Sequence, residues 1–241
     1  MSRNKPFLGI VSPRVDNRVL PEAAEVFSDW VHFEASSVGV TAMEDAAYRA
    51  AHARIPAAVD DLVKRGAQAI AIDGTSMTFA FGREFDSGLI AQMRERSGRP
   101  ITTMATSLVR GLQMFNAKRV AIAAAYDQTV TGQLVKFLEE HGLRTSSAKN
   151  LGIVSMDTVL DVTEERIVDL AESALAEGQA DALVIACGGL RTIPLTKKLE
   201  ERYSIPVVSS SQAAVWGSLR LIGITDAIAG LGRLFQVAEA A

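Results

Sequence analysis

The chain has 241 residues, and 25 lysines and arginines face 28 aspartates and glutamates, which gives a formal net charge of -3. This balance offers no electrostatic reason to expect a nucleic acid or an anionic membrane as a partner. The hydrophobic fraction of 48% is ordinary for a globular protein, and no apolar run approaches the ~18 residues of a membrane span. We expect one large domain or two small halves.

The single cysteine and the histidines limit the chemistry further. Cys187 has no partner for an internal disulfide, and the N-terminus lacks the apolar core of a signal peptide. We therefore expect a cytoplasmic protein with a reduced thiol. The three histidines and this cysteine show no metal-ligand spacing, so no metal site is expected.

Short apolar runs alternate with longer amphipathic stretches, which predicts an α/β fold with parallel sheets and right-handed crossovers. Strands are expected at 7–11, 69–72, 101–104, 120–124, 182–186 and 207–209, because these runs are almost continuously apolar or follow a proline. Helices are expected at 44–65, 86–96, 128–141, 163–177 and 195–202. Pro56 should interrupt the first helix, Thr163 should cap its helix, and Gly66 and Gly142 should end theirs.

The chain contains one pattern twice. Residues 66–76, GAQAIAIDGTS, are repeated as QADALVIACGG at 179–189, and RERSGRPITT at 94–103 is repeated as LEERYSIPVVS at 199–209. The run beginning at Arg119 also matches the strand beginning near Pro6. We therefore predict two similar halves, residues 1–112 with 217–241 and residues 113–216. Their strand ends should face each other across a pseudo-twofold cleft, since ligands bind beyond the carboxyl ends of such strands.

The strand ends that meet at this cleft carry the candidate chemistry. Cys187 ends a strand in one half, and Gly74 takes the equivalent place in the other. Hydroxyls and backbone N–H groups at 74–76 suit an anion, and the glycines at 188–189 let a ligand approach the backbone. Tyr126 adds a phenol. We interpret these groups as a cradle for a carboxylate, with Cys187 as a proton donor beside the α-carbon. The alternatives are helix capping by Thr75 and Ser76, an inert Cys187, and a core Tyr126.

Several segments carry a family resemblance along nearly the whole chain. They are GTSMTF at 74–79, AAAY at 123–126, LGI at 151–153, CGGL at 187–190, PVVSSS at 206–211 and GRLF at 232–235. With these segments the chain resembles the aspartate/glutamate racemase superfamily and, within it, the arylmalonate decarboxylase family. Racemases of the superfamily carry a cysteine in each half, and Gly74 replaces the first one here, as in the decarboxylases.

The resemblance implies cofactor-independent decarboxylation of disubstituted aryl- or alkenyl-malonates to chiral monocarboxylic acids. One carboxylate of this dicarboxylic acid would bind in an oxyanion hole made by Thr75, Ser76, Tyr126 and the N–H of Gly188. The other would lie in an apolar pocket, where a charge is poorly solvated. Loss of carbon dioxide leaves an enediolate, which Cys187 protonates from one face, so its thiol must start neutral. No metal or organic cofactor is implied, and the oligomeric state stays open.

The substrate-binding positions that match the decarboxylases are mostly apolar. They are Pro13, Val40, Met43, Tyr48, Met77, Met156 and Val159. Core packing is the alternative role for each pocket position. One loop departs from the family, because Arg14 and Arg18 stand where the decarboxylase loop is small and apolar. An inward Arg14 would stabilise the carboxylate that must be destabilised, and we expect both arginines to be solvated.

Two other functions compete with decarboxylation. A racemase or isomerase of small carboxylic acids, of the aspartate/glutamate racemase or maleate isomerase type, needs an acid and a base on opposite faces of the substrate. Gly74 removes one of the two thiols that would provide them. A carboxylate-binding protein without catalysis would keep Thr75 and Ser76 but would have no need of Cys187.

Overall fold

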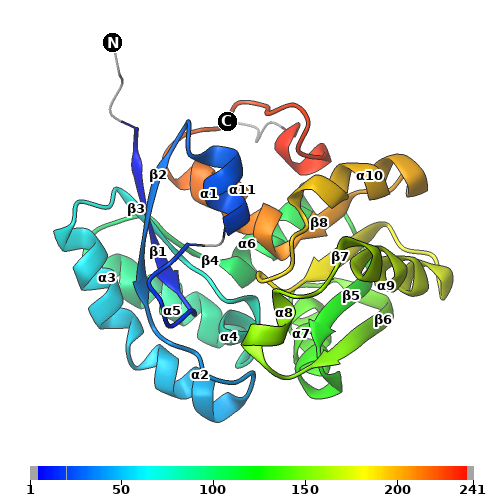
Figure 1. Ribbon diagram of the computed structural model, residues 1–241, viewed down its shortest axis with the longest axis horizontal. Helices are drawn as coiled ribbons and strands as arrows, with labels where there is room; N and C mark the ends of the chain where they lie inside the picture. The colour runs from blue at the N-terminus through cyan, green and yellow to red at the C-terminus, as the bar shows by residue number, and fades with distance from the viewer. Residues whose placement is uncertain (1–4, 20, 238–241) are drawn as a thin grey trace.

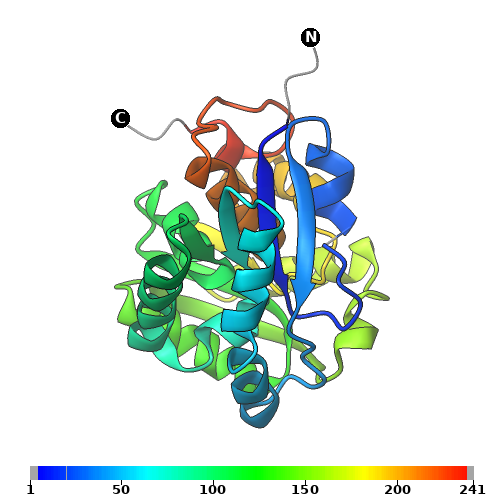
Figure 2. The ribbon, with the colours of Figure 1, turned by 90° about the vertical axis from the view of Figure 1, so that its left-hand side faces the viewer.

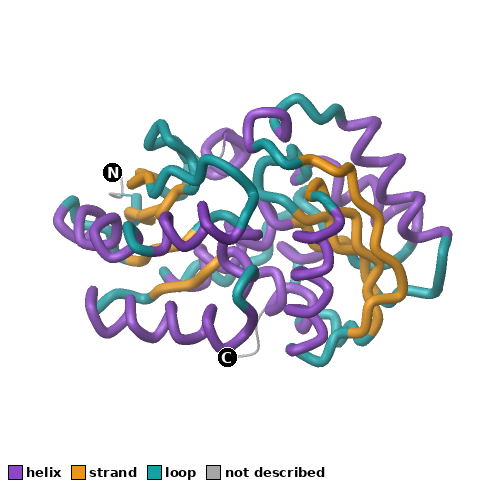
Figure 3. The backbone as a smooth tube through the Cα atoms, turned by 90° about the horizontal axis from the view of Figure 1, so that it is seen from below, coloured by secondary structure: helices purple, strands orange, loops and turns teal. Residues whose placement is uncertain are grey.

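The computed structural model describes residues 5–19 and 21–237 and contains two four-stranded parallel sheets flanked by helices. The strands form two separate groups with helices around and between them (Figure 3). This confirms the predicted α/β fold with two similar halves. None of the helices in the described ranges has the length and apolar character that crossing a membrane requires.

The first sheet and its helices occupy the N-terminal part of the chain (Figure 1). Their elements are β1 (Phe7–Ser12), α1 (Pro21–Phe27), β2 (His32–Ser37), α2 (Asp45–His52), α3 (Ile55–Lys64), β3 (Ala69–Ile72), α4 (Thr75–Phe79), α5 (Gly82–Ser97), β4 (Ile101–Thr103) and α6 (Met104–Gln113).

The second sheet follows with the same succession of strands. Its elements are β5 (Arg119–Tyr126), α7 (Gln128–Glu140), β6 (Arg144–Ile153), α8 (Met156–Val159), α9 (Glu164–Ala176), β7 (Ala182–Ala186), α10 (Ile193–Tyr203), β8 (Val207–Ser209) and α11 (Ser210–Leu221), before a short 3-10 helix, η1 (Arg233–Phe235).

The strand order is the same in both sheets. The first sheet runs β2-β1-β3-β4 and the second β6-β5-β7-β8, and all neighbouring strands are parallel. Figure 2 shows β1 and β2, in two shades of blue, running side by side. The internal repeat is therefore a repeat of structure, in which β3 corresponds to β7 and β4 to β8.

The central strands were found from sequence and two outer strands were missed. Every residue of β3 and β7 is buried, as their unbroken apolar sequences predict. In contrast, β2 and β6 lie at sheet edges and are mostly half-buried, with polar residues along their length. Such half-buried edge strands lack the continuous apolar pattern from which the other strands were predicted.

The helix signals are largely confirmed. The stretch 44–65 is broken between α2 and α3, with Pro56 in the first turn of α3. The Thr163 side chain accepts a hydrogen bond from the N–H of Arg166 and caps α9. Gly66 and Gly142 follow helices with φ of +97° and +80°, a conformation that favours glycine. The short helices α1, α4 and α8 and the buried helices α6 and α11 were not predicted.

Helices α6 and α11 pack closely and join the two sheets. A Cβ atom added at Gly217 of α11 would lie 2.4 Å from Oγ of Ser107 in α6, so only glycine fits there. One turn further along α6, a Cβ at Gly111 would lie 3.0 Å from Val208 of β8. This contact fixes the two sheets relative to each other, because packed interiors tolerate little extra volume.

The segment after α11 touches elements of both sheets. The rings of Phe235 and Phe27 lie 5.2 Å apart, which places η1 against α1. The N–H of Arg233 donates to the Glu200 carboxylate in α10 at 2.8 Å. Residues 238–241 lie outside the described ranges, and the assignment of 217–241 to the first half stays a prediction.

Candidate active site

A pocket of about 110 Å³ lies where the strand ends of the two sheets meet. Its walls include the ends of β1, β3, β5 and β7, as the repeat predicts. The segments after β2, β4 and β6 also contribute. The predicted site residues that line it are Pro13, Val40, Tyr48, Gly74, Thr75, Ser76, Met77, Tyr126, Met156, Cys187 and Gly188. Met43 and Val159 are buried but do not line this pocket. The structure thus gathers most of the predicted site, and the catalytic role of each residue stays a prediction.

Cys187 follows β7 and is 4% exposed. Its φ of +141° is a conformation that costs a non-glycine residue free energy, so its surroundings must hold it there. Its N–H donates to Oγ of Ser210 at 3.3 Å. Burial raises the pKa of the Cys187 thiol to about 11. At neutral pH the group is a protonated thiol, as a proton donor must be.

The opposite strand end is held by hydrogen bonds around Thr78. Its hydroxyl donates to the carbonyls of Gly74 and Thr75, at 3.1 and 3.0 Å, and accepts from the N–H of Ala105 at 3.2 Å. Gly74 has φ of +99°, and a Cβ there would lie 3.2 Å from Cβ of Pro13. The turn therefore suits glycine and anchors α4, which brings Thr75 and Ser76 into the pocket.

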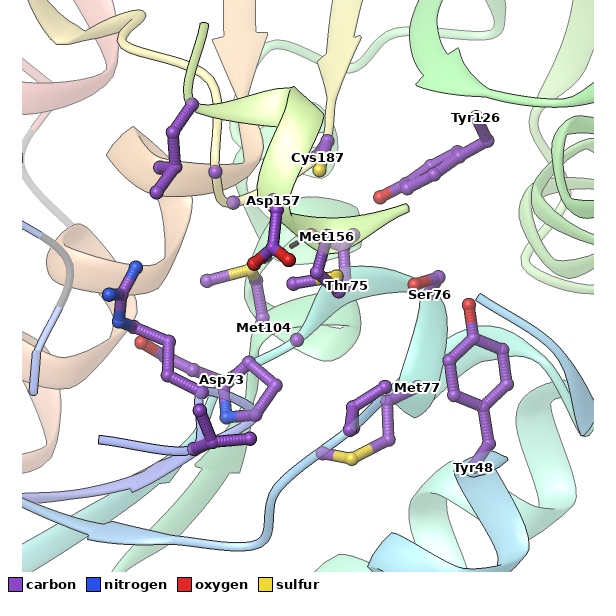
Figure 4. Close-up of a pocket in the computed structure, with 18 residues that line it drawn as sticks. Tyr48, Asp73, Thr75, Ser76, Met77, Met104, Tyr126, Met156, Asp157 and Cys187 are labelled. Carbon is purple, nitrogen blue, oxygen red and sulfur yellow. Dashed lines mark hydrogen bonds between the residues drawn. The ribbon is translucent and has the colours of Figure 1, made fainter. Parts of the chain in front are cut away.

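Neutral hydroxyl groups gather on one side of the pocket. Figure 4 shows Tyr48, Ser76 and Tyr126 on this side. The phenol of Tyr48 faces Ser76 and that of Tyr126 lies near Thr75 and Cys187, but neither phenol oxygen makes a hydrogen bond of normal geometry with the described residues. Burial raises the pKa of both phenols, so both remain donors at neutral pH.

The hydroxyl group of Thr75 is hydrogen-bonded to a sulfur atom. Its hydroxyl donates to Sδ of Met104 at 2.8 Å. Because a thioether is a weak acceptor, a carboxylate oxygen can take its place at little cost. This side of the pocket can therefore offer hydroxyl donors to an anion.

The apolar wall is built from residues of both sheets. Val40 and Met77 are buried and Met156 is half-buried in the pocket lining. The N–H of Met43 donates to the Val154 carbonyl at 3.4 Å, which links the loops that carry these side chains. A Cβ at Gly189 would lie 2.7 Å from Val159, so Val159 packs directly over the glycine turn after Cys187.

Arg14 lies in the pocket lining, with its side chain 23% exposed, and the expectation that it is solvated was wrong. Its Nε and a terminal nitrogen donate to the two carboxylate oxygens of Asp16, at 2.8 and 2.6 Å. Arg14 lowers the pKa of Asp16 to about 2, so this carboxylate is ionised at neutral pH. Arg18 is 79% exposed, as expected. The arginine at the pocket is thus neutralised by its own loop.

Sequence reasoning missed five further lining residues, which are Val15, Asp73, Met104, Asp157 and Leu160. For Asp73 a signal existed, because an acidic residue follows the wholly apolar β3 at the place where the second copy has Ala186. Met104 and Asp157 adjoin predicted features but carry no comparable signal. Among the described residues, no group of three or more histidine, cysteine, aspartate or glutamate side chains could hold a metal ion.

The two sheets have the same strand order, and their strand ends meet at a pocket that contains the single cysteine of the chain. This arrangement is that of an α/β enzyme with its active site between two similar halves. The family model for arylmalonate decarboxylase matches residues 8–235. Arylmalonate decarboxylase from Bordetella bronchiseptica is 34% identical over 233 residues, which are 96% of this chain and 97% of that protein. The chain belongs to the arylmalonate decarboxylase family and is an enzyme of the carboxy-lyase class.

Solved structures agree with this assignment. A crystal structure of a double mutant of arylmalonate decarboxylase in the liganded form has a TM-score of 0.92 and 33% identity, and the match covers 96% of this chain and 99% of that one. Maleate cis-trans isomerase from Nocardia farcinica bound to TRIS has a TM-score of 0.89 at 22% identity, covering 96% and 98%, and shares the fold. In sequence, the maleate isomerase of this organism matches at 31% identity over 137 residues, 56% of this chain and 54% of that protein.

Proposed function

We propose that this protein is a cytoplasmic, cofactor-independent decarboxylase of aryl- or alkenyl-substituted malonates, in which Cys187 is the proton donor. The observation that carries the proposal is one buried, neutral thiol at a strand end, opposed by the bare backbone of Gly74. The name of the Bordetella bronchiseptica relative supports malonates with an aryl group as the substrate class.

The proposed first step is the loss of carbon dioxide. One carboxylate accepts hydrogen bonds from Thr75, Ser76, Tyr126 and the N–H of Gly188, while the other lies against the apolar wall. The bond between the α-carbon and this second carboxylate breaks, and its electron pair passes into the enediolate of the first. Donors aimed at the growing negative charge stabilise that state, each typically by about 3–4 kcal/mol where such donors have been removed.

The second step is protonation at carbon. The Cys187 S–H gives its proton to the α-carbon from the one face that the sulfur occupies, so the product is a single enantiomer. The thiolate that remains takes a proton from water. Although burial raises the thiol pKa, the N–H of Gly189, the hydroxyl of Tyr126 and the N–H of Leu190 lie near the sulfur and favour the thiolate. They limit the cost of the transfer without ionising the resting thiol.

The runner-up function is isomerisation or racemisation of a small carboxylic acid. The maleate isomerase relatives and their shared fold support it. It needs a second proton-transfer group on the opposite face, where Gly74 has no side chain. Decarboxylation needs one donor only, and we therefore favour it.

Carbon dioxide release from phenylmalonate and vinyl-substituted malonates, run in deuterium oxide, tests the proposal. We expect release of carbon dioxide and one deuterium at the α-carbon of a single product enantiomer. Release of carbon dioxide from no malonate, together with isomerisation of maleate or racemisation of an α-substituted acid, would show that the runner-up function is correct.

A further inference from the structure

The pocket has two polar sides of different character. Its hydroxyl donors, on Tyr48, Ser76 and Tyr126, lie on one side, and the two acidic residues in its lining, Asp73 and Asp157, lie on the other (Figure 4). An anion suits the first side. The second side is rich in acceptors, and the proposed oxyanion hole does not use it.

Asp73 is the unusual member of the acidic side. The residue is 5% exposed, and its buried Oδ1 atom has no hydrogen-bond partner among the described residues. A buried carboxyl group without a partner is costly, whether ionised or neutral. Burial accordingly raises the pKa of Asp73 to about 7. The carboxyl group can therefore accept a hydrogen bond from a donor on a bound ligand.

The fold does not require an acid at this position. The second sheet has the same strand order, and the residue equivalent to Asp73 there is Ala186, which is fully buried. Asp73 also borders a smaller cavity, of about 10 Å³, whose walls include Ile10 and Phe33. That space holds one water molecule at most.

The nearby arginine does not satisfy Asp73. The Arg14 guanidinium is bound by both oxygens of Asp16, and Asp157 is exposed at the pocket. A substrate group that reaches this side therefore meets the buried Oδ1 atom of Asp73, which has no donor among the described residues.

We propose that Asp73 receives a hydrogen-bond donor on the α-substituent of the substrate, so that the preferred malonates carry a hydroxyl or amino group on their aryl or alkenyl arm. This inference rests on the proposed function, since it assigns the substrate class of the same pocket. With the retained carboxylate at the hydroxyl side and the departing one at the apolar wall, the acidic side remains for the substituent.

The experiment compares substituents of similar size in wild-type enzyme and in Asp73→Leu. The substrates are phenylmalonate, its meta- and para-hydroxy, methoxy and aminomethyl derivatives, and the readout is kcat/KM for carbon dioxide release. We expect wild-type enzyme to prefer the better hydroxy over the matching methoxy compound by about tenfold or more, because a hydrogen bond to a charged group contributes about 1.5–3 kcal/mol. The ratio should fall to about one in Asp73→Leu.

Two further variants sharpen the result. Asp73→Asn keeps the shape and an acceptor oxygen but not the charge, so it should retain part of the preference for hydroxyl and lose any preference for the aminomethyl cation. This separates a neutral donor from an ammonium group. Asp86→Asn is the matched control, because Asp86 is also buried with a raised pKa but lies outside the pocket lining. It should keep the wild-type ratio.

Binding is measured separately from turnover. Calorimetry with hydroxyphenyl- and methoxyphenylacetates, the corresponding products, should show the same preference in wild-type enzyme and its loss in Asp73→Leu. Failure of the proposed function appears as no carbon dioxide from any malonate, including phenylmalonate, while the acetates still report on Asp73. If the ratios for turnover and binding are the same in wild-type and both Asp73 variants, the inference is wrong and Asp73 serves only the small cavity. Should Asp73→Leu not fold, the Asp73→Asn comparison decides.

Discussion

The two sheets share one strand order but end their central strands differently. After β3 (Ala69–Ile72) the chain continues with Asp73 and Gly74, whereas β7 ends at Ala186 and continues with Cys187. Gly74 and Cys187 both have positive φ, +99° and +141°. A residue with positive φ thus stands at the equivalent position of each half. Glycine adopts a positive φ at no steric cost, whereas cysteine is strained, and strain or unpaired charge is retained where function needs it.

Removing the thiol of Cys187, which distinguishes the second strand end from the first, should have the largest effect on activity. Cys187→Ala should reduce turnover by about 10²–10⁴-fold, the usual contribution of a positioned general acid. Carbon dioxide release and product formation are measured together, and circular dichroism checks the fold. Ser210→Ala, which removes a hydrogen bond to the backbone of Cys187, is the milder control. A Cys187→Ala variant that keeps more than a tenth of the wild-type rate would contradict the assignment of the proton donor.

Replacing the acid of the first sheet should change how stability depends on pH. Asp73 has a folded-state pKa of about 7, above its ordinary value of 3.8, so the folded protein retains a proton that the unfolded chain loses as pH rises between these values. Stability should therefore fall over this range, by at most about 4 kcal/mol. Asp73→Asn removes this loss.

Thermal unfolding of wild-type and Asp73→Asn at pH 4, 5, 6 and 8 measures the effect. The melting temperature of the variant, relative to that of wild type, should rise steadily with pH. Parallel curves across this range would mean that Asp73 ionises in the folded protein as easily as in water.

A charge placed on the apolar wall tests the strain that decarboxylation needs. Met156→Lys should pair with the departing carboxylate and stabilise the bound substrate more than the transition state, in which that charge is leaving. A charged hydrogen bond of about 1.5–3 kcal/mol corresponds to a roughly tenfold to hundredfold fall in kcat, with KM unchanged or lower. Met156→Leu is the control. A wild-type rate in a folded Met156→Lys enzyme would remove Met156 from the mechanism.

Making the two strand ends alike is the mildest change. Gly74→Cys puts a side chain where φ is +99° and where Cβ would lie 3.2 Å from Pro13, so we expect a loss of about 1–3 kcal/mol in stability. With thiols on both faces, the variant should also exchange the α-hydrogen of arylacetic acids substituted at the α-carbon and lower the enantiopurity of the product. Absence of deuterium exchange in either enantiomer, in a folded variant, would show that positions 74 and 187 do not face each other.

The repeat made the architecture and much of the pocket predictable. Central strands can be predicted because their residues are almost all apolar. The repeat then predicts that Gly74, Cys187 and Tyr126, at the ends of such strands, lie close together. Edge strands such as β2 were not predicted, because their half-buried, polar residues show no regular pattern in the sequence. Arg14 was misplaced because sequence does not reveal that Asp16, two residues later, neutralises it within the pocket lining.

The burial of Cys187 also bears on how the enzyme withstands oxidants. With a thiol pKa of about 11, roughly one molecule in ten thousand carries a thiolate at pH 7, and the thiolate is the form that peroxides and disulfides attack. Because Cys187 is only 4% exposed, its sulfur is also out of reach of a second protein's thiol. The group that makes the enzyme work in our proposal is thus kept from sulfenic acid and mixed disulfides by the same burial that keeps it protonated.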